Sequence, residues 1–136
     1  MQYWLLKTEP ETYSWAQLVK DKKTNWSGVR SPAGRANLMK MKTGDRAFFY
    51  HTGDERQVVG VCEVVKEHYP DPSDETGKFV QVDVKPIEPV PHAVTLAAIK
   101  AEPKLAQMRL VREGRLSVSP VTPEEWKLVA KMAGLK

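Results

Sequence analysis

Cysteine is almost absent from this sequence, since Cys62 is the only one among 136 residues. A single cysteine excludes an internal disulfide and gives no support to a cysteine-based zinc site, which suggests a reducing compartment, the cytoplasm or, in a eukaryote, the nucleus. The three histidines, His51, His68 and His92, are far apart and lack the spacing of a metal site. We therefore expect neither a metal nor an organic cofactor.

Long apolar runs and nucleotide-binding signatures are missing as well. No stretch approaches the length of a membrane span, and the opening MQYWLLKTEP lacks the basic start and apolar length of a secretory signal. Neither GxxxxGK[ST] nor GxGxxG occurs. Cys62 lies in the apolar segment QVVGVCEVV, which favours a small core residue over a nucleophile. We expect no membrane partner, no catalytic residue and no enzymatic activity.

The bulk composition is that of a globular protein. About 41% of the residues are hydrophobic and 28% are charged, and the length suits one compact domain over residues 1–136. The net charge of +4 is compatible with a nucleic-acid partner but does not identify one. We expect a monomer, or at most a weak dimer.

Strand patterns recur along the chain and turn signals separate them. Alternating or continuous apolar residues predict strands at residues 3–7, 45–52, 57–65, 79–85 and 115–121. Pro120 suggests that the last of these strands lies at an edge or ends there. The segment 70–78 is rich in proline, acids and glycine and predicts an exposed loop, in which Asp71, Asp74 and Glu75 form a solvated acidic turn.

Four polar residues precede helical patterns and predict helix starts at Ser14, Ser31, Thr95 and Thr122. Gln17 and Glu125 complete two expected capping boxes. Gly134 is expected to end the last helix. Together these elements predict an α+β domain with a mixed, strongly curved sheet or small barrel of five to six strands, with helices packed around it.

Six segments carry a family resemblance. YWLLKTEP, NWSGVRSPAGRANL, MKTGDRAFFYHTG, VVGVCEVVKEHYPD, FVQVDVKPI and RLSVSPVTPEEW, in this order, resemble the EVE domain family over nearly the whole chain. The resemblance implies a PUA-like mixed β-barrel, related to YTH domains, that reads modified bases such as 5-methylcytosine or 5-hydroxymethylcytosine in DNA or RNA. Many members of the family carry asparagine where Ser31 stands here, so a base contact from that asparagine is lost or changed.

The residues themselves suit a pocket for a flipped base. Stacking on an aromatic ring contributes about 1–3 kcal/mol per base, and Trp26 can supply that ring. Thr8, Glu9 and Ser27 can bond to the polar edge of the base, with Glu9 accepting from the amine of a cytosine. Lys7–Thr8 and Trp26–Ser27 also stand where YTH domains carry similar residues. The candidate base-binding residues are Lys7, Thr8, Glu9, Trp26, Ser27, Val29 and His51.

Phosphates that flank a flipped base need cations or hydrogen-bond donors. The candidates for this role are Arg30, Arg35, Arg115 and Ser117. Lys7 could serve here as well, and the helix that follows Ser31 offers free N–H groups at its start.

Other interpretations remain open at this point. Trp26 could be core filler, and Arg30 could form a structural ion pair, with Glu9 as a partner. A rival function is that of the ASCH-type amidohydrolases, which act on acylated cytidines and which Lys7, Thr8 and Glu63 could mimic. A protein–protein adaptor is a third function, supported only by the exposed loop.

Overall fold

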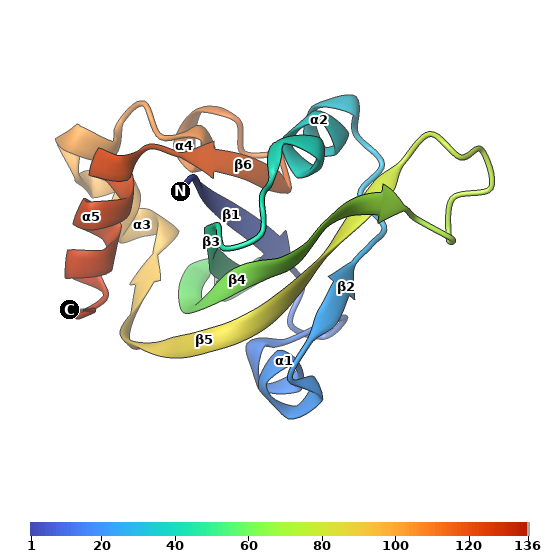
Figure 1. The fold of residues 1–136 in the computed structure, drawn as a ribbon. Helices are drawn as coiled ribbons and strands as arrows, with labels where there is room; N and C mark the ends of the chain where they lie inside the picture. The colour runs from blue at the N-terminus through green and yellow to red at the C-terminus, as the bar shows by residue number, and fades with distance from the viewer. Residues whose placement is uncertain (136) are drawn as a thin grey trace.

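The computed structural model describes residues 1–135 as one mixed six-stranded sheet with helices around it (Figure 1). The strands are β1 (Tyr3–Thr8), β2 (Thr24–Trp26), β3 (Arg46–His51), β4 (Gln57–Pro70), β5 (Val80–Thr95) and β6 (Val118–Val121). The helices are α1 (Trp15–Asp21), α2 (Pro32–Lys40), α3 (Leu96–Ala101), α4 (Arg109–Arg112) and α5 (Pro123–Met132), with a short 3₁₀ helix η1 (Pro103–Leu105). The predicted α+β class is confirmed.

The sheet has the order β2-β5-β4-β3-β1-β6. β1 runs parallel to β3, and every other neighbouring pair is antiparallel. Within residues 1–135 this order does not close from β6 back to β2, so the expected barrel takes the form of an open sheet. β4 and β5 form a long curved hairpin, visible in Figure 1, and the register shifts along it account for the curvature.

β5 continues well past the predicted end at residue 85. Pro86, Pro89 and Pro91 interrupt the strand pattern, because proline cannot donate to a strand ladder. The ladder tolerates them because its register shifts at this point: Pro86 lies opposite Cys62 and Pro89 opposite Gly60, with one shift between these two pairs and another beyond Pro89. The sequence pattern therefore shows where the regular hydrogen-bond ladder between β5 and β4 is interrupted, but it does not show where β5 ends.

Three short elements escaped the sequence patterns. β2 has only three residues, and α4 and η1 are four and three residues long, too short to show a period. The last strand is also shorter than predicted and begins at Val118.

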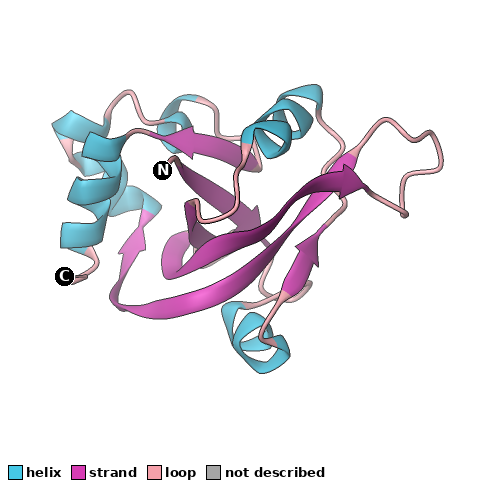
Figure 2. Cartoon of the chain, viewed as in Figure 1, coloured by secondary structure: helices cyan, strands magenta, loops and turns pink. Residues whose placement is uncertain are grey.

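Both faces of the sheet are buried, which explains the strongly apolar strands. Leu6 and Phe49 belong to one core cluster, whereas their neighbours Leu5 and Phe48 belong to a second one, as the two-residue period of a strand requires. Figure 2 shows α3 and α5 standing together at one end of the sheet, with α1 and α2 toward the other. Each core cluster is therefore covered by its own group of helices.

All four predicted helix starts are confirmed as caps, at Ser14, Ser31, Thr95 and Thr122. The capping box of Thr122 and Glu125 is complete, with both reciprocal hydrogen bonds. The capping box predicted for Ser14 is wrong, because the side-chain amide of Gln17 donates to Asp21, 2.8 Å away, and does not bond back to the Ser14 backbone. Only the Ser14 hydroxyl, which accepts from the Gln17 N–H, serves as the cap.

Cys62 is fully buried, as predicted. Burial raises the pKa of its thiol to about 12, so it stays protonated at neutral pH. The residue contributes to the core and has no nucleophilic character.

Ser119 in β6 gives a stability prediction that does not involve the functional site. Its side chain is buried, and its hydroxyl has no hydrogen-bond partner among residues 1–135. Burial of an unpaired hydroxyl costs about 1–3 kcal/mol. We expect Ser119→Ala to raise the free energy of unfolding by about 1 kcal/mol in urea denaturation. Thr122→Ala, which removes a cap, should lower it by about 1 kcal/mol. A destabilised Ser119→Ala protein would show that the hydroxyl has a partner.

Candidate nucleic-acid interface

A cavity of about 520 Å³ opens where β1, β2, the start of α2 and the segment before β6 converge. We call it the Trp26 cavity. Predicted site residues from three separate stretches of sequence line it: Lys7, Thr8, Trp26, Ser27, Val29, Arg30, Arg115 and Ser117. Residues that sequence reasoning did not assign to the site also line it: Thr12, Tyr13, Thr24, Asn25, Gly28 and Ser31.

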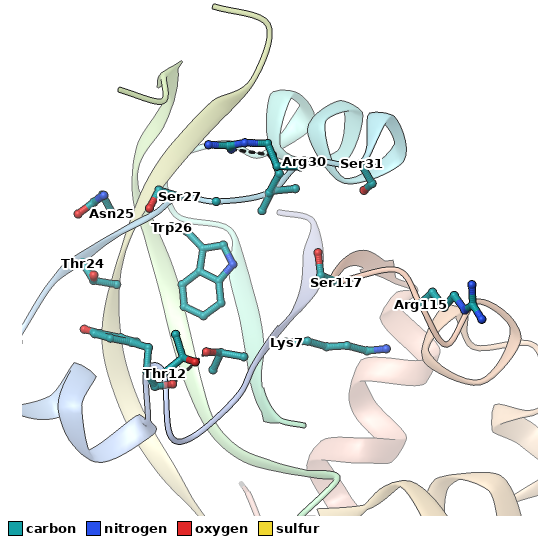
Figure 3. Close-up of a pocket in the computed structure, with 14 residues that line it drawn as sticks. Lys7, Thr12, Thr24, Asn25, Trp26, Ser27, Arg30, Ser31, Arg115 and Ser117 are labelled. Carbon is teal, nitrogen blue, oxygen red and sulfur yellow. Dashed lines mark hydrogen bonds between the residues drawn. The ribbon is translucent and has the colours of Figure 1, made fainter. Parts of the chain in front are cut away.

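Trp26 belongs to the cavity wall and to the core at the same time. It ends β2, opposite Val82 of β5, and is 8% exposed. Its ring meets the rings of Phe49 and Tyr13 edge to face, with centroids 5.6 and 6.5 Å away. Figure 3 shows the indole in the middle of the lining residues. The two interpretations of Trp26, aromatic wall and core residue, therefore hold together.

The hydroxyl of Thr8 has a defined hydrogen-bond direction. Thr8 Oγ1 donates to the carbonyl of Tyr13 at 3.0 Å, with the carbonyl of Glu9 as a longer alternative at 3.4 Å, and either bond uses its only O–H. The oxygen can then offer only lone pairs to a ligand. The Tyr13 hydroxyl donates to Asp21, 2.9 Å away, and burial raises the pKa of Tyr13, so this hydroxyl stays protonated.

Lys7 fastens the segment before β6 to the end of β1. Its Nζ donates to the carbonyl of Gly114 at 2.7 Å, and its backbone N–H donates to the carbonyl of Ser117 at 2.9 Å. Burial lowers the pKa of Lys7. Arg115 lies in the segment that Lys7 holds and is exposed at the cavity rim, and no ion pair within residues 1–135 involves it. The cavity therefore has one cationic side (Figure 3).

Arg30 has a structural partner, but it is Asp71 and not Glu9. Arg30 Nη1 lies 3.0 Å from Asp71 Oδ2, and Nη2 donates to Ser73 Oγ at 2.8 Å. The guanidinium also lies over the ring of Phe79, 5.5 Å from its centroid. The loop 70–78 therefore packs against the cavity wall at Arg30.

The prediction that Asp71 belongs to a solvated turn is wrong, because only 2% of this residue is exposed. Burial alone would raise the pKa of Asp71. Hydrogen bonds from Ser73, from the Gly28 N–H and from Arg30 outweigh that effect and hold the pKa well below its usual value. Asp71 is thus a buried carboxylate that remains charged.

His51, predicted to contact the base, lies outside the Trp26 cavity, and both of its ring nitrogens have partners within the protein. Its Nε2 accepts from the backbone N–H of Trp15 at 3.0 Å, and its Nδ1 lies 2.9 Å from Glu55. Because Nε2 accepts, Nδ1 is the ring nitrogen that donates to Glu55. The hydrogen bond from His51 lowers the pKa of Glu55.

Glu9 and Arg35 also lie outside the cavity. Glu9 is exposed in the turn after β1, where its carbonyl accepts from the N–H groups of Thr12 and Tyr13. Arg35 is exposed on α2, beyond the capped first turn. Sequence reasoning placed both residues by their closeness to site segments, but the chain turns away from the cavity before Glu9 and the helix carries Arg35 past it.

The residues that sequence reasoning missed come mostly from segments on either side of α1. Tyr13 and Thr24 meet at the cavity because α1 folds between them and β2 pairs with β5. Tyr13 offered one signal, an aromatic residue directly before the Ser14 cap.

Within residues 1–135, no group of three His, Cys, Asp or Glu side chains could hold a metal ion. Among the same residues no helix has the length and hydropathy needed to cross a membrane.

Known proteins resemble this chain in sequence and in fold. Human thymocyte nuclear protein 1 is 32% identical, over 96% of this chain and 73% of the human protein. An NMR structure of a protein from Rhodopseudomonas palustris is 50% identical, with a TM-score of 0.93 over 98% of this chain and 94% of that chain. The crystal structure of human THYN1 protein in complex with 5-methylcytosine-containing DNA is 31% identical, with a TM-score of 0.91 over 100% of this chain and 99% of that chain.

An ASCH protein from Zymomonas mobilis is more distant, at 14% identity and a TM-score of 0.64 over 97% of this chain and 99% of that chain, and shares only the fold. The EVE domain family model matches residues 2–132. The match spans nearly the whole chain and confirms the resemblance carried by the six sequence segments. This chain belongs to the EVE domain family.

Proposed function

We propose that this protein binds a modified cytosine, flipped out of nucleic acid, in the Trp26 cavity. The observation that carries the proposal is the cavity itself, in which one aromatic wall stands among hydroxyl groups and beside cationic residues. Its volume of about 520 Å³ falls within the ~300–1,000 Å³ of typical small-ligand sites. The human relative crystallised with 5-methylcytosine-containing DNA supports the choice of base.

We assign the reading role to Thr8, which lines the cavity, and not to Glu9, which lies outside it. Its hydroxyl donates to Tyr13, so Thr8 Oγ1 can accept a hydrogen bond from the exocyclic amine of a cytosine. Thymine presents a carbonyl oxygen at that position, which cannot donate. The cavity should therefore prefer cytosine derivatives to thymine even where both carry a 5-methyl group.

The phosphates of the nucleic-acid backbone need cations or hydrogen-bond donors at the cavity rim. Lys7 and Arg115 provide them on the side formed by β1 and the segment before β6. Recognition of this kind requires no covalent bond to form or break. We therefore propose a non-enzymatic reader that acts as a monomer in the cytoplasm, or in the nucleus of a eukaryote.

The rival amidohydrolase requires Lys7, Thr8 and Glu63 to share one site. Lys7 is level with Tyr50 of β3, whereas Glu63 is level with Arg46, four residues along the same strand. At about 3.3 Å per residue this separates them by roughly 13 Å along the sheet. Glu63 instead pairs with Arg46 and Lys85, at 3.6 and 3.7 Å. This geometry does not favour the rival amidohydrolase.

The proposal can be tested with single-stranded oligonucleotides that differ in one base: cytosine, 5-methylcytosine, 5-hydroxymethylcytosine or thymine. We expect tighter binding to one of the modified cytosines than to cytosine or thymine. Thr8→Val keeps the shape of the side chain but removes the acceptor, and should reduce the preference for 5-methylcytosine over thymine about tenfold, within the ~1–3 kcal/mol of a good base contact. The conservative Thr8→Ser should restore the preference.

Thr43→Val, at an exposed site away from the cavity, serves as the matched control. Equal binding of all four strands by the wild type would contradict the proposed function. Full discrimination by Thr8→Val would remove Thr8 as the reading residue. Incubation with N4-acetylcytidine adds a test of the rival, since release of cytidine would show hydrolysis.

A further inference from the structure

Asp71 is the most completely satisfied buried charge beside the Trp26 cavity. Its Oδ2 accepts from the Gly28 N–H at 2.8 Å and from Arg30 Nη1 at 3.0 Å. Its Oδ1 accepts from the N–H and the hydroxyl of Ser73, at 2.8 and 2.6 Å. A buried carboxylate is tolerated only when it is paired in this way, and two of its donors belong to the cavity wall.

The wall segment 27–30 depends on these contacts for its shape. Gly28 has φ at +81°, a left-handed conformation that glycine adopts without strain. Asp71, 43 residues along the chain from Gly28, fixes that turn through the Gly28 N–H. Asp71 also holds the side chain of Arg30, the last residue of this wall segment. Ser73 and the ring of Phe79 hold the same side chain.

The same contacts neutralise Arg30. Its positive charge faces the carboxylate of Asp71 at 3.0 Å, and its side chain is 40% exposed. Arg115, which lies apart from Arg30 and beyond Ser117 in Figure 3, is exposed and has no such partner within residues 1–135. The loop beside Arg30 adds the acidic residues Asp74 and Glu75, which repel phosphate. The two sides of the cavity therefore differ in charge.

We propose that Asp71 and Arg30 are positioning residues that hold the Ser27–Arg30 wall in its binding shape, and that Arg30 makes no phosphate contact. The nucleic-acid backbone then crosses the cavity on the Lys7 and Arg115 side. This inference rests on the proposed function, and it replaces the expectation that Arg30 and Arg115 act alike on phosphates.

Salt titration separates a positioning arginine from one that contacts phosphate. Each phosphate contact contributes about 0.7–0.9 to the slope of log Kd against log salt concentration. Arg115→Gln should lower this slope by about that amount and weaken binding to modified and unmodified strands alike. Arg30→Gln should leave the slope unchanged and reduce the preference for the modified strand about tenfold. Lys78→Gln, which removes a charge from the same loop as Asp71, should change neither quantity.

NMR exchange of the Gly28 amide proton tests the positioning role without any ligand. We expect a protected amide in the wild type and at least tenfold faster exchange in Asp71→Asn, whose amide group cannot accept all four hydrogen bonds. Should Asp71→Asn fail to fold, Ser73→Ala removes one of the four donors and should give a smaller increase in exchange. An unprotected Gly28 amide in the wild type would overturn the positioning role.

The remaining outcomes are also decisive. A salt slope that falls as much in Arg30→Gln as in Arg115→Gln would overturn the inference and make Arg30 a phosphate contact. If the wild type prefers no modified base, the proposed function fails and with it the assigned backbone path. The Gly28 exchange rates then still decide whether Asp71 and Arg30 hold the wall.

Discussion

Trp26→Ala is expected to lower the free energy of unfolding by about 3–5 kcal/mol, the usual cost of removing a large buried aromatic side chain. The indole is 8% exposed and packs edge to face against Phe49 and Tyr13, so its loss leaves a void at the junction of core and cavity. Urea denaturation measures the change. Binding of a modified strand should be lost as well, since the cavity loses its aromatic wall.

Trp26→Phe separates these two effects because it keeps a ring in the core while shortening the wall. It should retain most of the stability and weaken binding by up to about 1–3 kcal/mol. Trp126→Phe is the matched control, because Trp126 stacks on Phe48 and Tyr3 in the second core cluster. It should alter stability only. A Trp26→Ala protein as stable as the wild type would show that the indole is not part of the core.

Asp71→Ala is expected to destabilise the fold by about 2–3 kcal/mol at pH 7. Breaking a fully buried ion pair costs ~3–5 kcal/mol, and the smaller figure applies here because Arg30 is 40% exposed. The substitution also leaves the Gly28 N–H without its acceptor. The midpoint of urea unfolding reports the loss, and an unchanged midpoint would contradict a structural role for Asp71.

Low pH should remove much of the stabilisation that the Asp71 carboxylate contributes. The pKa of Asp71 is lower in the folded protein than in the unfolded chain. Its stabilising contribution is therefore complete above the unfolded value of about 4 and declines as the pH falls toward the folded value. The stability gap between wild type and Asp71→Asn should narrow between pH 7 and pH 3. Asp54→Asn, in an exposed turn, is the control. A gap that stays constant would mean that Asp71 is not held in its charged form.

Local sequence patterns predicted much of the fold, because helix caps and strand periods depend on near neighbours. Ser31 and Thr122 cap their helices through hydrogen bonds to residues within the next four positions. Phe48 and Phe49, which are neighbours in sequence, point to the two opposite faces of their strand. The continuation of β5 through Pro86 was not predictable, since it depends on register shifts against β4. The open edge of the sheet is likewise set by pairings between distant strands.

The candidate site was predictable where segments project directly into the cavity. Lys7 and Trp26 stand at strand ends that meet there. The partners of side chains were not predictable from local sequence, since each joins distant positions. His51 bonds to the backbone of Trp15, 36 residues away, and Arg30 pairs with Asp71, 41 residues away. A loop composition typical of solvated turns concealed a buried carboxylate.

The pairing of β1 with β6 imposes a delay on the protein as it is synthesised. Lys7 and Gly114, joined by a hydrogen bond, are separated by 107 residues. At about 5–20 residues per second, a ribosome needs roughly 5–20 s after making β1 before this partner emerges. During that interval one edge of β1 stays uncovered and the cationic side of the cavity does not exist. The Trp26 cavity is therefore complete only after translation of β6, and until then β1 keeps an unpaired edge.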